Sequence, residues 1–309
     1  MGKVILSTSK NDVHYAEMTL PSHDGEELFV RRYSPLDEKT LRTLMIVHGI
    51  NEHGGRYDHI ARRFVNEGWN VIIGDHRGHG LSSGVPVHVR HFREYVNDLE
   101  TIRSHFELVP QQTALLGHSM GGLIITRYLQ THPDKVAAAI MISPLLGVNV
   151  EVPRTTIAIA KLLSKLSPRF RFRSRVSPCE TTRNQSVLEK RAADPLIHKS
   201  LTVGWFFAMR SALETAWEEA DSVDLPLLVL QAGADSIVSP EATEYWLDLV
   251  NSDDKSFQLF PEHLHELLNE PTWQETTTKI LEWLGQRIGN SDEATHSASQ
   301  TNAELAIDE

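Results

Sequence analysis

The sequence predicts an α/β protein built on a mostly parallel β-sheet with helices on both faces. Short apolar runs of strand length alternate with segments of helical spacing, first over residues 44–142 and again over 226–288. Each of these runs is followed by polar or glycine-rich residues, as at 48–53 and 75–80. Strands that alternate with helices in this way are typical of parallel sheets covered by helices.

Residues 13–34 are predicted to form a β-hairpin around the turn residues His23-Asp24-Gly25. Gly68 marks the end of the first helical segment of the alternating part. The expected strands there are 44–47, 71–74, 113–116, 137–142, 226–230 and 256–260, and the expected helices are 57–67, 92–108, 120–131, 240–250 and 273–288.

The alternation stops near Pro144 and resumes at Pro226, and the pattern between them is mostly helical. We therefore expect a helical cap inserted between two strands of one sheet. The predicted organisation is a first core part at 1–144, a cap at 145–222, a second core part at 223–288 and a disordered acidic tail at 289–309.

Charge and composition limit which binding partners and which cellular compartment we expect for this chain. The chain has 309 residues and a formal net charge of −11, which disfavours nucleic acid as a partner. The one cysteine, Cys179, excludes an intrachain disulfide, favours a reducing compartment and is interpreted as a bystander. No apolar run approaches the roughly 18 residues of a membrane span, and the N-terminal apolar stretch is too short for a signal peptide, so we expect a cytoplasmic protein.

A nucleophile motif stands between one predicted strand and the helix that follows it. Residues 117–121 read Gly-His-Ser-Met-Gly, the G-x-S-x-G pattern, between the strand at 113–116 and the helix at 120–131. In this context the motif lifts a serine hydroxyl above the end of a sheet. Because a serine hydroxyl is a weak nucleophile, Ser119 needs a general base and an acid that orients the base.

Residues after two later strands supply that base and acid. Asp235 and His265 complete the order Ser, Asp, His, with His265 as base and Asp235 orienting its ring. We expect the backbone N–H groups of Ile50 and Met120 to hold the oxyanion. The competitors that we place second are His263 for the base, and Asp221 and Asp224, which lie at the wrong end of their strand, for the acid.

Four motifs follow the predicted strands: His48-Gly49-x-x-Glu52-His53-x-x-Arg56-Tyr57, Asp75-x-Arg77-Gly78-His79-Gly80-x-Ser82, Gly117-His118-Ser119-Met120-Gly121-Gly122 and His265-Glu266-Leu267-x-Asn269-Glu270. With these motifs the chain resembles the monoacylglycerol lipase and lysophospholipase-like group of α/β-hydrolases. The resemblance runs from residue 13 to 288 and implies an eight-stranded sheet, a helical cap, no cofactor, and hydrolysis of carboxylic esters that carry one acyl chain.

A metal site is the alternative that the many histidines raise. No H-E-x-x-H or comparable ligand spacing occurs, so we expect no metal. The histidines that gather at one end of the predicted sheet are His48, His53, His76, His79, His118, His263 and His265.

The predicted function is cleavage of a single-chain lipid ester, foremost monoacylglycerol to fatty acid and glycerol, through an acyl-enzyme. A lysophospholipase and a general short-chain carboxylesterase stay open as alternatives.

Residues 152–179 hold seven basic residues and no acid, so this segment is either a solvated cap helix or a contact with an anionic membrane surface. Glu52 and Arg56, four residues apart, are read either as a helix pair or as groups near the substrate head. The oligomeric state stays open.

Overall fold

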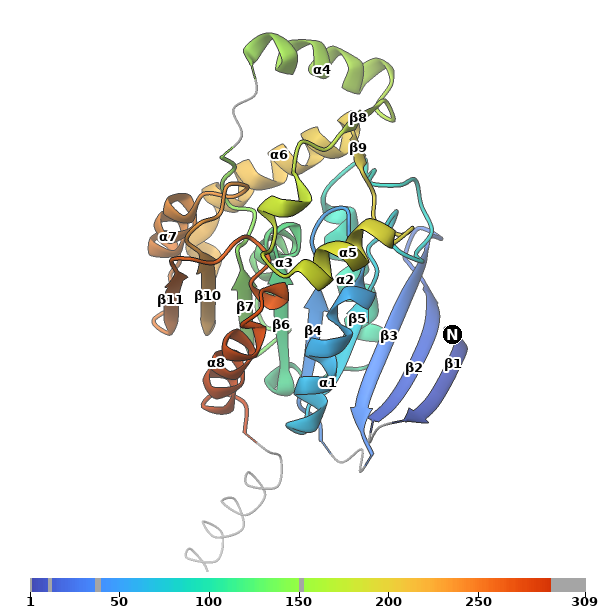
Figure 1. The fold of residues 1–309 in the computed structure, drawn as a ribbon, viewed down its shortest axis with the longest axis vertical. Helices are drawn as coiled ribbons and strands as arrows, with labels where there is room; N and C mark the ends of the chain where they lie inside the picture. Colours follow the sequence, from blue (N-terminus) through green and yellow to red (C-terminus); the bar gives the residue numbers. More distant parts are fainter. Residues whose placement is uncertain (1, 11–12, 37–39, 150–152, 290–309) are drawn as a thin grey trace, which may run out of the picture.

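A computed structural model describes residues 2–10, 13–36, 40–149 and 153–289 (Figure 1). One sheet runs through it in the order β1-β2-β3-β5-β4-β6-β7-β10-β11. The strands of this sheet are β1 (Lys3–Lys10), β2 (Val13–Pro21), β3 (Glu27–Pro35), β4 (Thr43–Val47), β5 (Asn70–Gly74), β6 (Thr113–His118), β7 (Ala138–Ile142), β10 (Leu227–Ala232) and β11 (Lys255–Phe260). The helices are α1 (Asp58–Asn66), α2 (Arg93–His105), α3 (Met120–Thr131), α4 (Arg154–Leu166), α5 (Gln185–Ala193), α6 (Val203–Glu218), α7 (Pro240–Leu249) and α8 (Trp273–Gly285).

The strands from β5 to β11 pair in parallel, while β1, β2 and β3 pair antiparallel at one edge. The predicted α/β fold and the predicted hairpin are confirmed. The expected count of eight strands is wrong by one, because residues 3–10 add the edge strand β1. Five of its eight residues are polar and it has a partner on one side only, so its sequence lacks the apolar run of a central strand.

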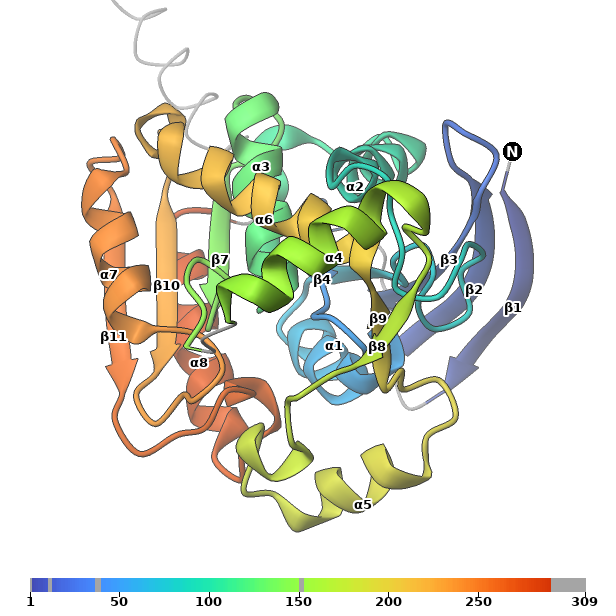
Figure 2. The same cartoon turned by 90° about the horizontal axis from the view of Figure 1, so that it is seen from above.

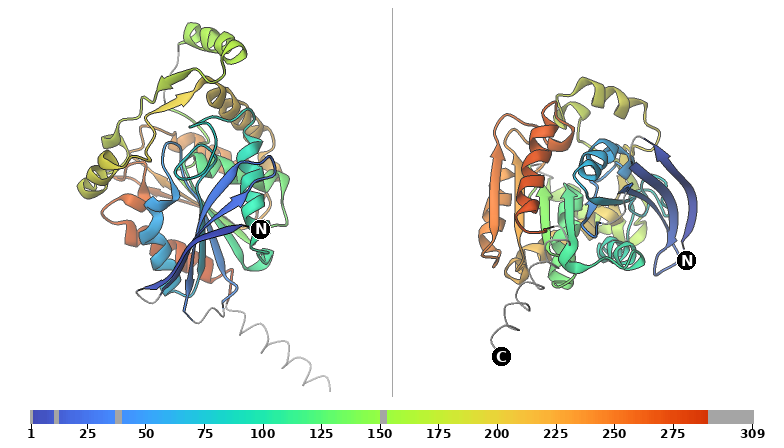
Figure 3. Two further views of the ribbon diagram at one scale, coloured as in Figure 1. Left: turned by 90° about the vertical axis from the view of Figure 1, so that its right-hand side faces the viewer. Right: turned by 90° about the horizontal axis from the view of Figure 1, so that it is seen from below.

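The central strands are buried on both faces, which is why they read as continuous apolar runs. Every residue of β4, β6, β7 and β10 is buried. One core lies between the sheet and α2, α3 and α6, and the other lies between the sheet and α1 and α8. Figure 3 shows these two helical layers on opposite sides of the twisted sheet.

The segment between β7 and β10 rises over the carboxyl ends of the strands (Figures 1 and 2). It contains α4, α5 and α6, as the helical pattern predicts, and also the short antiparallel pair β8 (Arg171–Arg173) and β9 (Ser200–Thr202), which was not predicted. The apolar stretch of α6 is largely core, since Trp205 and Met209 are buried. Of the predicted tail, only Gly289 lies within the described residues.

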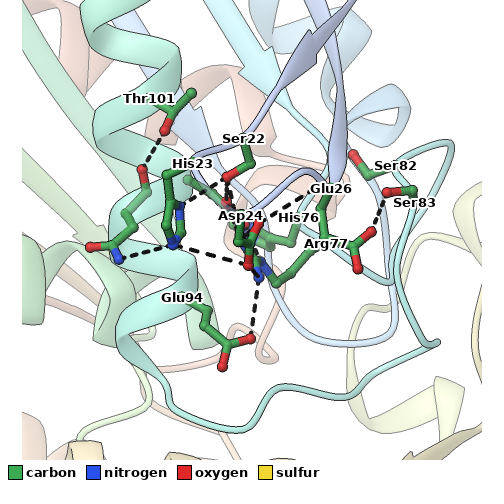
Figure 4. A network of polar contacts seen from close by, with 12 residues as sticks. Ser22, His23, Asp24, Glu26, His76, Arg77, Ser82, Ser83, Glu94 and Thr101 are labelled. Atoms are coloured by element: carbon green, nitrogen blue, oxygen red, sulfur yellow. Dashed lines mark hydrogen bonds and ion pairs between the residues drawn. The ribbon is translucent and has the colours of Figure 1, made fainter.

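A buried arginine fixes the loop that follows β5 (Figure 4). The Arg77 guanidinium donates two hydrogen bonds of 2.6 Å to Asp98 on α2, and it also pairs with Asp24 at 2.6 Å and with Glu94 at 3.2 Å. Ser22 donates to the same Asp98 carboxylate at 2.5 Å. The loop is thereby held between the β2–β3 turn and α2, and it lies next to the histidines described below.

Candidate active site

Ser119 stands in a strained turn between β6 and α3. Its backbone has φ 53° and ψ −115°, a conformation that costs energy for a residue with a Cβ atom. The flanking glycines make the turn possible. A Cβ atom on Gly121 would lie 2.0 Å from the carbonyl oxygen of Val47, and one on Gly117 would lie 2.6 Å from the carbonyl oxygen of Gly121. The G-x-S-x-G spacing is therefore required by close backbone contacts.

His265 and Asp235 are joined by a hydrogen bond of 2.7 Å between Nδ1 of the ring and Oδ2 of the carboxylate. The backbone N–H groups of Ile237 and Val238 donate to the other carboxylate oxygen at 2.9 and 3.0 Å, which fixes its orientation. Both side chains are buried. An Nδ1–H that donates to Asp235 leaves Nε2 of His265 unprotonated, the form that a general base needs.

The His265 ring lies beside His118, the residue before Ser119, with ring centroids 4.8 Å apart. Within the described ranges no hydrogen bond joins the Ser119 hydroxyl to the His265 ring. Bonds of this kind often shorten only when substrate is bound. The rival His263 is bonded elsewhere, with Nε2 2.7 Å from Oγ1 of Thr272, which supports the choice of His265.

The two backbone groups predicted for the oxyanion lie at the ends of the parallel strands. A Cβ atom on Gly49, next to Ile50, would lie 3.4 Å from Cβ of Ser119, so the loop after β4 passes close to Ser119. Met120 is the first residue of α3, where N–H groups have no partner within the helix. In the part of the chain that the structure describes, neither N–H donates a hydrogen bond.

The buried carboxylate of Glu52 connects the pieces of this site. Its Oε1 accepts from the Gly49 N–H at 2.6 Å, from the Tyr57 hydroxyl at 2.8 Å and from Nδ1 of His118 at 3.2 Å. Its Oε2 accepts from the guanidinium of Arg56. The residue before Ile50 and the residue before Ser119 are thus held by one side chain.

Arg56 extends the network to the residue after His265. It donates to Glu266 at 2.6 Å, and Arg191 of α5 donates to the other oxygen of Glu266 at 2.6 Å. Burial alone would raise the pKa of Glu266, but the charge of Arg56, with a further contribution from Arg191, lowers it to about 2. The pKa of Glu52 is likewise held well below its usual value, chiefly by Arg56 against the effect of burial.

The sequence predicts for Glu52 and Arg56 either a helix pair or a place near the substrate head, and it assigns no role to Glu266 or Arg191. The sequence signal for Glu266 is its place directly after His265. Arg191 carries no such signal, because the contact joins residues 75 positions apart.

Three buried histidines pack behind the loop after β4. Nδ1 of His48 lies 2.8 Å from the Gly49 carbonyl, and Nε2 accepts from the backbone N–H of His76 at 3.0 Å. His48 therefore shapes this loop. Burial lowers the pKa of His48 and of His79 to about 3, and it lowers the pKa of His76 well below its usual value. Among the described residues, no group of three or more His, Cys, Asp or Glu side chains is placed to hold a metal ion.

A nine-stranded, mainly parallel sheet with a serine at the strand–helix turn defines an α/β-hydrolase. Residues 38–272 match the family model described as "Serine aminopeptidase, S33", and the chain belongs to this family. Within the α/β-hydrolases it belongs to the monoacylglycerol lipase-like group, and it is a carboxylic ester hydrolase.

Similar proteins cover most of the chain. It is 31% identical to monoglyceride lipase of Rattus norvegicus over 87% of this chain and 90% of the relative, and 29% identical to phospholipase YtpA of Bacillus subtilis over 76% and 91%. It is 32% identical to an uncharacterized abhydrolase domain-containing protein of Dictyostelium discoideum over 91% of this chain, and it spans 30% of the length of that protein. The crystal structure of Paleococcus ferrophilus monoacylglycerol lipase superposes with a TM-score of 0.77, at 28% identity, over 84% of this chain and 99% of that one.

Acidification is expected to destabilise the protein through the three buried histidines. Their folded pKa values lie below the ordinary 6.5, so the unfolded chain binds more protons as the pH falls from 6.5 towards about 3, and the free energy of unfolding decreases. Urea unfolding at a series of pH values measures how steeply the free energy of unfolding changes with pH. At about pH 5 we expect His79→Phe to reduce proton uptake on unfolding by about one.

The matched control is His91→Phe, since this ring is exposed and should leave the slope unchanged. Equal slopes for His79→Phe and the unmodified protein would contradict the assignment of this pH dependence to the buried cluster.

Proposed function

We propose that this chain hydrolyses monoacylglycerols through a covalent acyl-enzyme on Ser119. The observation that carries the proposal is the His265–Asp235 pair at 2.7 Å, with its ring beside the turn that holds Ser119. Oγ of Ser119 attacks the ester carbonyl carbon while Nε2 of His265 takes its proton. The resulting oxyanion accepts hydrogen bonds from the N–H groups of Ile50 and Met120.

Collapse of this intermediate breaks the bond to glycerol, whose oxygen takes the proton from His265. A water molecule then attacks the acyl-enzyme, with His265 again as base, and releases the fatty acid and restores Ser119. Asp235 holds the ring in the required tautomer and stabilises its charged form.

The head group is inferred from the family motifs and from relatives named monoglyceride lipase. A relative named as a phospholipase keeps lysophospholipid as the second candidate, and a general short-chain carboxylesterase is the third. A substrate panel separates them.

The panel measures fatty-acid release from monoacylglycerols of increasing chain length, from lysophosphatidylcholine and from short esters. We expect the highest kcat/KM for monoacylglycerols, rising up to about fourfold per added CH₂ until the pocket is full, because each buried CH₂ contributes about 0.8 kcal/mol. Ser119→Ala should abolish release, and Asp235→Asn should lower kcat about 10⁴-fold. Activity that survives in Ser119→Ala would refute the mechanism. A preference for lysophosphatidylcholine would leave the mechanism in place and change only the head group assigned to the substrate.

We further propose that residues 145–222 act as a cap and that their basic part, 152–179, contacts an anionic membrane surface. On α4 the side chains of Ile159, Leu162 and Leu166 are 63, 60 and 74% exposed and lie on one face of the helix. Lys161 and Lys165 are exposed on the same helix. Arg171 is instead committed to the protein, since it donates to Ser200 and to the Pro86 carbonyl. No helix in the described ranges is long and apolar enough to span a membrane.

Co-sedimentation with phosphatidylcholine vesicles, with and without phosphatidylserine, tests this contact. Lys161→Glu with Lys165→Glu should weaken binding to the anionic vesicles at least about tenfold, because each basic residue contributes about 1 kcal/mol near such a surface. The matched control reverses two charges on α1 and α8, Arg62→Glu with Lys279→Glu. Equal loss in both double variants, or no binding by the unmodified chain, would contradict the proposal.

A further inference from the structure

A groove of about 720 Å³ lies outside the proposed active site, between α2, α3, α6, the C-terminal end of α4 and the loop that precedes α2. Ser119, Asp235 and His265 are not among the residues that line it. Its volume falls within the range of sites that hold small molecules. Its apolar lining comes from Val89, Phe92, Val96, Phe207, Ala208 and Ala212.

The ionisable side chains that line this groove are all basic. Three arginines and three histidines line it, and no aspartate or glutamate does, although the whole chain has a net charge of −11. Arg127 pairs with Glu219 at 2.6 Å. Arg90 and Arg93 are exposed, and neither forms an ion pair in the part of the chain that the structure describes. The histidines are His88, His91 and His132.

Positive charge is concentrated at the His88 end. Burial and the nearby charges of Arg169, Arg90 and Arg171 lower the pKa of the His88 imidazole, against the opposing charge of Glu94. Arg171 is fixed there by its bond of 2.6 Å to the Pro86 carbonyl, and Nδ1 of His88 lies 3.0 Å from Oγ1 of Thr202. Arg90 and the fixed Arg171 therefore place positive charge near the His88 end of the groove.

We propose that this groove is a second ligand site, and that it binds a long-chain carboxylate with its chain on the apolar lining and its head on Arg90 and Arg93. An apolar lining beside unpaired guanidinium groups matches an amphiphile with one anionic end, and arginine binds carboxylates through paired N–H donors. No carboxylate lines the groove itself, and the neighbouring Glu94 is compensated by the backbone N–H groups of Arg90 and His91 and by Arg77.

The ligand class is that of the fatty acid released by the proposed reaction. This second site rests on the proposed function in one respect only, namely that hydrolysis of monoacylglycerol would supply the fatty acid. Binding itself is independent of turnover, so the two can fail separately.

The test uses the full chain after a fluorophosphonate has blocked the active-site serine, which keeps the ligand out of the reaction centre. Photo-crosslinking with a diazirine-bearing palmitate, followed by peptide mapping, should label residues 88–97 and 204–215. Failure of the fluorophosphonate to react would count against the proposed function, whereas reaction without labelling at these residues would overturn the second site.

Two variants and two further ligands sharpen the result. Arg90→Glu with Arg93→Glu should weaken palmitate binding at least about tenfold, while the same double variant binds hexadecanol unchanged. Ser211→Trp, at an exposed lining position of α6, should reduce binding of both by filling the trough. Acetate, which has the charge without the chain, should compete poorly. Equal palmitate affinity in the double variant and the unmodified chain would overturn the proposal.

Discussion

The buried carboxylate of Glu52 is the constraint on which the proposed active site depends. One oxygen accepts hydrogen bonds from Gly49, Tyr57 and His118, and the other accepts from Arg56. A buried carboxylate lowers the stability of the folded state unless opposite charges and hydrogen bonds compensate for its lost hydration. Removal of one partner therefore leaves an uncompensated buried charge. Because Gly49 precedes Ile50 and His118 precedes Ser119, the compensation that Glu52 requires also fixes the geometry that the proposed chemistry requires.

The same network connects His265, the proposed base, to the segment above the sheet. Glu266 follows His265 directly and holds Arg56 of the core and Arg191 of α5. A second contact joins the two parts, with Nε2 of His53 2.8 Å from the Asp194 carboxylate. The position of α5 and the position of the base are therefore coupled through short charged contacts.

Local pattern predicts the sheet, its helices and the inserted segment because buried parallel strands and amphipathic helices leave periodic signals. It misses β1, which is mostly polar and lies at an edge, and the short pair β8–β9, whose first strand is fully exposed. The sequence predicts Ser119, Asp235 and His265 as site residues because each follows a strand, and the structure joins His265 to Asp235 at 2.7 Å. The ion-pair network could not be predicted, since Glu52 and Arg56 suggest a local helix pair while their other partners lie far along the chain.

The most direct test of this account is kcat and KM for monoacylglycerol hydrolysis by Glu52→Gln. The amide oxygen can still accept from Gly49 but cannot pair with Arg56 as an anion, so we expect kcat to fall by about 10²-fold with KM little changed, as for loss of oxyanion alignment. Circular dichroism at the assay temperature verifies folding, and Glu67→Gln, which removes a surface ion pair with Arg63, should be neutral. An unchanged kcat in folded Glu52→Gln would contradict the claim that this carboxylate aligns the site.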